Sequence, residues 1–171
     1  MNEKREQVFK AKRIQVTHRE RVKASAEQFF SLACPVEELK WIDSWQFDMI
    51  YSESGKNENN CIFKESMSGL FVLNRPELST CWYTTIYDTG KYRFDALLLY
   101  GSVAAGKFEF HIAEEDKDFS TGLWMLTYTS LSEDGNNIID ESFKDRMLGM
   151  LTFLGKSAKH YLETGEIFRA A

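Results

Sequence analysis

The sequence is poor in the residues that break or cross-link a chain. Only two prolines occur in 171 residues, Pro35 and Pro76, and there are three cysteines, Cys34, Cys61 and Cys81. An odd number of scattered cysteines argues against a disulfide framework and favours reduced thiols, which indicates a cytoplasmic protein. The chain has no CxxC pair and no Cys/His cluster with zinc spacing, so we predict no metal site.

Long apolar runs are also missing. No stretch approaches the ~20 apolar residues of a membrane span, and no apolar segment follows the polar first residues as in a secretory signal. We therefore expect no integral membrane association. The net charge of −5 is spread along the chain without a basic stripe, which argues against nucleic acid as a partner. GxGxxG, Walker, GxSxG and HExxH motifs are absent, so we predict no cofactor.

No internal repeat, low-complexity tract or flexible linker divides the chain, and its length suits one domain. Residues 1–12, with the mixed-charge segment KREQVFKAKR, are predicted to be a solvated lead-in, and residues 13–168 a single domain. Aromatic residues make up 14% of the chain, which suits either a well-packed core or a lined pocket.

The period-2 alternation typical of half-buried strands recurs through most of the domain. In the first strand, 13–22, Ile14, Val16 and Val22 share one parity. Further strands are predicted from the alternation and from β-branched and aromatic runs, with short polar turns between them. They are expected at 47–52, 61–67, 80–87, 91–100, 107–115 and 123–131. Seven strands with short connections predict an antiparallel sheet.

Helical segments interrupt and end this pattern. Ser25 is a fair N-cap for a first short helix, and Pro35 can open a second. From Ile138 the apolar residues follow steps of three and four up to a glycine stop at Gly165. This predicts a terminal helix of ~27 residues, ~40 Å long, which Asn136 or Asn137 can cap.

The order of elements predicts an α+β protein. An antiparallel sheet with one apolar face must cover that face, and the terminal helix is the only long amphipathic element. We therefore predict a helix-grip fold: a curved antiparallel sheet of about seven strands around a long C-terminal helix, with two short helices after strand 1 closing one end.

Several segments of the sequence resemble those of a known protein superfamily. ACPVEELKWIDSWQFDMIYSESG, KFEFHIAEE, TGLWMLTYTSLSEDGN and the helix end YLETG are similar to bacterial members of the SRPBCC superfamily. This group includes START domains, pollen-allergen-like proteins and polyketide cyclase/dehydrase and lipid-transport families. The resemblance runs from about Ile14 to Gly165 and implies a cavity between sheet and helix. Where such relatives often have Pro-Gly between the two tryptophans, this chain has Asp43-Ser44.

Two groups of side chains are predicted around that cavity. Trp41 and Trp45, at the joint between the second short helix and the next strand, are expected at the seam between lid and sheet, as corner packing or as ligand contacts. The cavity wall is expected to comprise Tyr51, Phe63, Phe94, Phe108, Phe110 and Met125 from the sheet, and Met147, Met150, Leu151 and Leu154 from the helix. The last strand, 123–131, is bulky on both faces, so its inward parity stays open.

His18 and Glu20 are unusual because they share parity with the apolar residues of the first strand. Burying a charge without a partner is costly. They therefore pair with each other, meet other polar groups, line a wet cavity, or lie where a twist exposes the strand. In a cavity they could anchor a ligand or act as a base held by a carboxylate.

Three functions follow from these expectations. The favoured one is binding or transport of a small hydrophobic or amphipathic ligand, such as a lipid or a polycyclic aromatic, by a monomer or weak homodimer. An alternative is a cyclase, dehydratase or hydrolase that uses His18 and Glu20. A third is a chaperone-associated interaction protein, as some relatives are. Fold analogy alone does not assign a reaction.

Overall fold

The computed structural model describes residues 9–169. Its strands form one seven-stranded antiparallel sheet. The predicted number and arrangement of strands are confirmed. The sheet order is β1-β7-β6-β5-β4-β3-β2. The strands are β1 (Arg13–Val22), β2 (Phe47–Tyr51), β3 (Ile62–Glu65), β4 (Thr80–Asp88), β5 (Arg93–Tyr100), β6 (Ala104–Glu114) and β7 (Ser120–Ser130).

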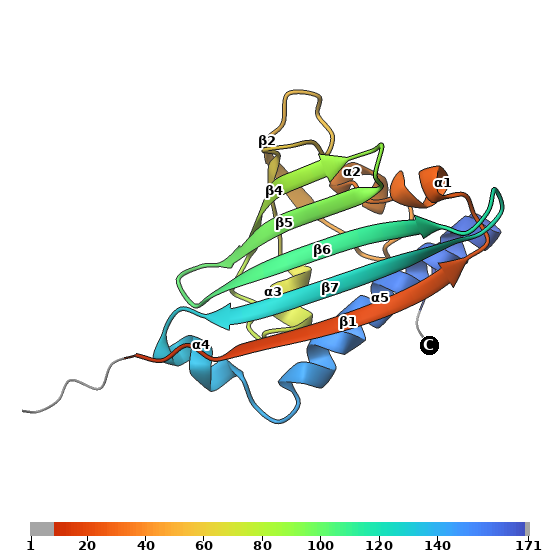
Figure 1. Ribbon diagram of the computed structural model, residues 1–171. Helices are drawn as coiled ribbons and strands as arrows, with labels where there is room; N and C mark the ends of the chain where they lie inside the picture. Colours follow the sequence, from red (N-terminus) through yellow and green to blue (C-terminus); the bar gives the residue numbers. More distant parts are fainter. Residues whose placement is uncertain (1–8, 170–171) are drawn as a thin grey trace, which may run out of the picture.

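The helices lie on the concave side of this curved sheet and at its ends, with α5 running behind it in Figure 1. They are α1 (Ala26–Phe30), α2 (Pro35–Glu38), α3 (Met67–Phe71), α4 (Glu133–Ile138) and α5 (Phe143–Thr164). The predicted helix-grip arrangement, with two short helices after β1, is confirmed. No helix in residues 9–169 has the length and apolar character needed to cross a membrane.

The start of the long helix was predicted wrongly. Ser132, not an asparagine, caps a separate helix α4 by accepting a hydrogen bond from the Gly135 N–H at 3.1 Å. Ile139 then leaves the helical conformation, and α5 begins at Phe143. Asn136 is used elsewhere: its side chain accepts from the Lys12 N–H at 3.0 Å and bonds Ser130. The predicted stop is confirmed, because Gly165 adopts φ 76°.

A short helix also replaces the predicted end of the third strand. β3 ends at Glu65 because that carboxylate accepts a hydrogen bond from the Ser68 N–H, in the first turn of α3, at 3.0 Å. Gly69 permits a close approach there, since a Cβ would lie 1.9 Å from the Leu78 carbonyl oxygen. The helix α3 therefore folds onto the concave side of the sheet, where α5 also lies (Figure 1).

The long helix packs directly on one margin of the sheet. Its contacts are mainly with β1 and, to a smaller extent, β7. Gly155 of α5 faces His18 so closely that an added Cβ would lie 2.6 Å from the His18 Nε2. Lys159 Nζ donates to the Arg21 carbonyl oxygen at 2.8 Å. The helix is thus fixed against β1, and its distance from β3, β4 and β5 sets the space left in the interior.

Candidate functional site

A cavity of about 870 Å³ lies between the middle of the sheet and α5. Four parts of the chain supply its walls: strands β3–β6, the α3 region, the segment between α2 and β2, and α5 with the residues after it. The lining residues are Glu38, Ile42, Asp43, Ser44, Trp45, Phe63, Glu65, Ser66, Met67, Ser68, Leu70, Phe71, Pro76, Trp82, Phe94, Phe108, Arg146, Gly149, Met150, Phe153, Leu154 and Phe168. Its size falls within the ~300–1,000 Å³ of ordinary ligand pockets.

The sheet wall of the cavity is a continuous aromatic surface. Phe63 and Trp82 are cross-strand partners with nearly parallel rings, 5.4 Å between centroids. Trp82 meets the edge of Phe108 at 5.0 Å, and Phe94 lies 5.6 Å from Phe108. Because these residues share the inward parity of neighbouring strands, the alternation alone places them side by side. The predicted positions of Phe63, Phe94 and Phe108 at the wall agree with this surface.

Two adjacent stripes of α5 face inward: one packs in the core, and the other lines the cavity. Phe143, Met147, Leu151, Gly155 and Ala158 are buried and fill the core. The neighbouring stripe, Arg146, Gly149, Met150, Phe153 and Leu154, lines the cavity. Both stripes keep the helical spacing of three and four residues. The predicted lining residues Met150 and Leu154 lie on the second stripe, whereas Met147 and Leu151 lie on the first and do not line the cavity.

The two tryptophans after α2 are both anchored to the chain that precedes them, at one end of the cavity. Trp41 Nε1 donates to the Leu32 carbonyl at 3.3 Å, and Trp45 Nε1 donates to the Pro35 carbonyl at 2.9 Å. Trp45 also stacks on Phe47 and lines the cavity. The predicted position at the seam between lid and sheet agrees with these bonds. The tight turn between them is made by Ser44 in the left-handed region, φ 60°, which favours glycine.

A second, much smaller space of about 30 Å³ adjoins the cavity beneath α1. Trp41, Phe110 and Trp124 line it, and Glu38, Phe94, Phe108 and Leu154 line both spaces. The predicted lining residue Phe110 therefore faces inward, but toward this pocket. Glu38 lies at the junction of the two spaces.

Two glutamates bring polar chemistry into the apolar cavity, and sequence analysis missed both. Glu65 is buried; its Oε1 accepts from the Trp82 indole N–H at 3.0 Å and its Oε2 from the Ser68 N–H at 3.0 Å. Burial, and then the nearby charge of Glu65, raise the pKa of Glu38 to about 8. Glu65 shares the parity of Cys61 and Phe63, a signal that could have indicated its inward position.

Two predicted wall residues point away from the cavity. In β2, Met49 pairs with Phe63 but Tyr51 pairs with Ile62, so one extra residue, Ile50, forms an irregularity that reverses the parity. Tyr51 is consequently 51% exposed. In β7 the buried parity belongs to Trp124, and Met125 lies on the outer face. The predicted inward orientation of Tyr51 and Met125 was wrong.

His18 and Glu20 face α5 rather than the cavity. His18 Nε2 lies 3.2 Å from Glu20 Oε2, and Lys159 Nζ lies 3.5 Å from Glu20 Oε1. The sequence left several arrangements open for His18 and Glu20. In the structure they pair with each other, and Glu20 also pairs with Lys159. Because neither residue lines the cavity, they lack contact with any molecule bound there.

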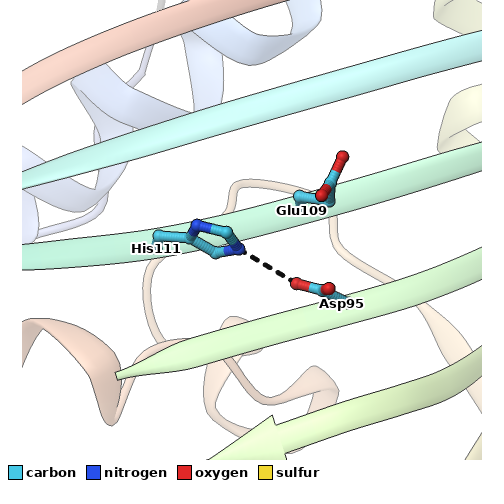
Figure 2. A group of neighbouring side chains, drawn as sticks. All are labelled: Asp95, Glu109 and His111. Atoms are coloured by element: carbon cyan, nitrogen blue, oxygen red, sulfur yellow. Dashed lines mark hydrogen bonds and ion pairs between the residues drawn. The ribbon is translucent and has the colours of Figure 1, made fainter. Parts of the chain in front are cut away.

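A second polar cluster, Asp95, Glu109 and His111, lies on the outer face of β5 and β6 (Figure 2). Arg93 Nη2 lies 2.5 Å from the carboxylate of the buried Asp95, which His111 Nε2 also meets at 3.1 Å. Burial opposes ionisation of Asp95, but the hydrogen bonds and charges of Arg93 and His111 outweigh it and lower its pKa. Lys107 pairs with Glu109 at 2.8 Å. Each carboxylate thus already has a cationic partner, so the cluster has a structural role.

Comparison with solved structures identifies the architecture, whereas the chain matches no protein-family model and no curated protein sequence. An aromatase/cyclase from Streptomyces sp. R1128 is similar over 92% of this chain and 100% of its own, with TM-score 0.63 and 7% identity. A START superfamily protein from Mycobacterium smegmatis covers 87% of this chain and 97% of its own, with TM-score 0.64 and 15% identity. This chain has the helix-grip fold.

Norcoclaurine synthase from Thalictrum flavum shares the same helix-grip fold, with TM-score 0.62, 12% identity and coverage of 92% of this chain and 98% of its own. The predicted resemblance to SRPBCC-type proteins is therefore confirmed in the fold. At these identities the likeness gives the architecture, and the site has to be argued from its own residues.

Proposed function

We propose that the protein binds a small hydrophobic or amphipathic molecule, such as a lipid or a polycyclic aromatic compound, between the sheet and α5. The observation that carries the proposal is the cavity of about 870 Å³ with its aromatic wall of Phe63, Trp82, Phe94 and Phe108. An apolar surface of this size, left unfilled in an otherwise packed domain, costs stability that a bound molecule would restore. We further propose that it acts in the cytoplasm as a monomer or weak homodimer.

The proposal is tested by filling the cavity from its helix side. Leu154→Trp adds bulk to a lining residue, and Leu148→Trp makes the same change on an exposed part of α5 outside the lining. The unmodified chain is expected to take up the neutral apolar dye Nile red saturably. Leu154→Trp should weaken this uptake at least ~tenfold, a loss of ~1.4 kcal/mol, and Leu148→Trp should leave it unchanged.

Native mass spectrometry of the freshly purified chain provides a second measurement. A co-purified small molecule that disappears in Leu154→Trp and persists in Leu148→Trp would support the proposal. No saturable uptake of Nile red, together with no co-purified molecule, would contradict it.

Acid–base catalysis in the same cavity is a second candidate, and Glu38 is the observation that favours it. A general acid works best when its pKa is near the working pH, and the pKa of Glu38 is raised to about 8 beside a second carboxylate. Among the similar structures are an aromatase/cyclase and a synthase. Glu38, not the His18–Glu20 pair, would then transfer the proton. Loss of turnover in Glu38→Gln without loss of affinity for a neutral substrate would favour catalysis over binding alone.

A further inference from the structure

The charges around the cavity do not balance. Its charged lining residues are Glu38, Asp43, Glu65 and Arg146. Arg146 is already engaged, because its Nε donates to the Val72 carbonyl at 2.9 Å and its Nη1 lies 3.1 Å from Asp140. Among the described lining residues no other cation faces the three carboxylates, so the cavity favours positive over negative occupants.

The two inner glutamates differ in how they are held. Glu65 accepts two N–H donors, from Trp82 and Ser68, which fixes a carboxylate in place. The carboxyl group of Glu38 makes no hydrogen bond or ion pair with any residue between 9 and 169, although it is partly buried and borders both spaces. A polar group without a partner in an apolar cavity is costly unless a ligand supplies that partner.

The aromatic wall of the cavity also favours a cationic ligand. Trp82, the donor to Glu65, presents its ring among Phe63, Phe94 and Phe108. Aromatic faces attract cations, tryptophan most strongly, by ~0.5–2 kcal/mol depending on burial. We propose that the ligand is a cationic amphiphile, with a protonated or quaternary amine beside Glu38 and Glu65 and an apolar body against the aromatic wall. This inference rests on the proposed binding function and specifies its ligand class.

Other ligand classes fit this site less well. A fatty-acid anion would meet the carboxylates of Glu65 and Asp43 without a free cation to pair with. A neutral ligand could accept one hydrogen bond from protonated Glu38, but it would leave the Glu65 charge uncompensated. An amine interacts favourably with both glutamates and also with Trp82.

Isothermal titration calorimetry with two isosteric probes tests this inference on the full chain. Benzyltrimethylammonium and neopentylbenzene have the same shape, and only the first is charged. The cation is expected to bind ~tenfold more tightly or better at pH 8, equivalent to ~1.4 kcal/mol. Glu38→Gln should remove most of that preference by weakening the binding of the cation far more than the binding of neopentylbenzene.

Glu37→Gln is the matched control, because Glu37 is on the same short helix but pairs with Lys40 outside the cavity lining. Both probes should bind this variant as they bind the unmodified chain. Equal affinity for the two probes, tighter binding of the neutral probe, or equal loss of both in Glu38→Gln would overturn the inference. Nile red uptake separates the failure of the ligand class from the failure of the binding function. If the chain takes up the dye but shows no preference for the cationic probe, only the cationic ligand class is contradicted. If it neither takes up the dye nor binds the cationic probe, the binding function is contradicted.

The pH dependence gives a second readout. The affinity for the quaternary cation, which does not titrate, should rise as the pH passes through 8 and Glu38 ionises. The charged and titratable groups that act on or near Glu38 are Glu65 from β3 and Tyr87 from β4. Arg146 from α5 and Asp43 line the same cavity, and Glu37 and Cys34 are its neighbours along the chain. The rise should vanish in Glu38→Gln; a rise that persists there assigns the titration to another group and counts against the inference.

Discussion

The interior has two halves: in one, α5 packs directly on the sheet, and in the other, a cavity separates them. Along β1 and β7, α5 is in direct contact, with Gly155 against His18 and with Met147 and Leu151 completely buried. In front of β3–β6, α5 is separated from the aromatic wall by the cavity. One stripe of the helix thus holds the fold together, and the adjacent stripe borders the space where we propose that the ligand binds.

This difference explains how a small domain can keep a large cavity. The packed half buries Met147 and Leu151 completely, and the aromatic contacts within the sheet wall contribute further burial that does not need the helix. Side chains that border the cavity have fewer packing partners, and the polar groups Glu38 and Glu65 lie there. Stability and binding should therefore respond separately to substitutions in the two halves.

The largest effect is expected from two leucines three residues apart on α5. Leu151→Ala removes a completely buried side chain and should lower the free energy of unfolding by ~3 kcal/mol. Leu154→Ala removes a side chain that already borders the cavity, so it loses fewer contacts, and we expect ~1 kcal/mol or less. Urea denaturation measures both. Equal losses would contradict the division into a packed and a hollow half.

A smaller effect, counted per unit of pH, is expected from the titration of Glu38. Its folded pKa is raised to about 8, above the ~4.3 of an unfolded glutamate. Its contribution to stability is thus fully present below ~pH 4 and is lost as the pH rises through 8, by at most ~1.4 kcal/mol per unit. Glu38→Gln should flatten this slope and be more stable at pH 8. The measurement is urea unfolding between pH 5 and 9, and an unchanged slope would refute the assignment.

The smallest effect is expected at the turn between Trp41 and Trp45, which borders the hollow half. Ser44 has φ 60°, a conformation that costs a non-glycine residue ~1 kcal/mol or more. Ser44→Gly should relieve this strain, offset in part by the extra freedom of glycine in the unfolded chain, for a net gain of ~0.5 kcal/mol. Ser31, at φ −58°, is the control position, where glycine should destabilise. Thermal unfolding that shows a loss at Ser44 would contradict this account.

The sequence predicted the strands and the inward side of the sheet better than the shape of the space between the sheet and α5. Alternation is a local pattern, so the strands, the inward side of Phe63, Phe94 and Phe108, and the stop at Gly165 could be derived from it. The irregularity at Ile50 could not, because one inserted residue changes parity without a compositional signal. The division between α4 and α5 was hidden because the apolar spacing continues across the break.

The polar site itself depends on contacts between distant parts of the chain. Glu38 ends a helix of four residues, too short to show a periodic face, and its environment is created by β3 and α5. For His18 and Glu20 the alternation left several arrangements open, and the structure has them paired with each other beneath α5. The alternation could not predict the position of α5. This helix covers His18 and Glu20, and the cavity lies in front of β3–β6 instead.

The placement of the tryptophans has a practical consequence. Trp45 and Trp82 line the large cavity, and Trp41 and Trp124 line the small space beside it, so all four indoles of the chain border the interior void. Their intrinsic emission should shift in wavelength or be quenched when a guest enters. Compound libraries could then be screened on the unlabelled chain, with each variant reporting its own occupancy.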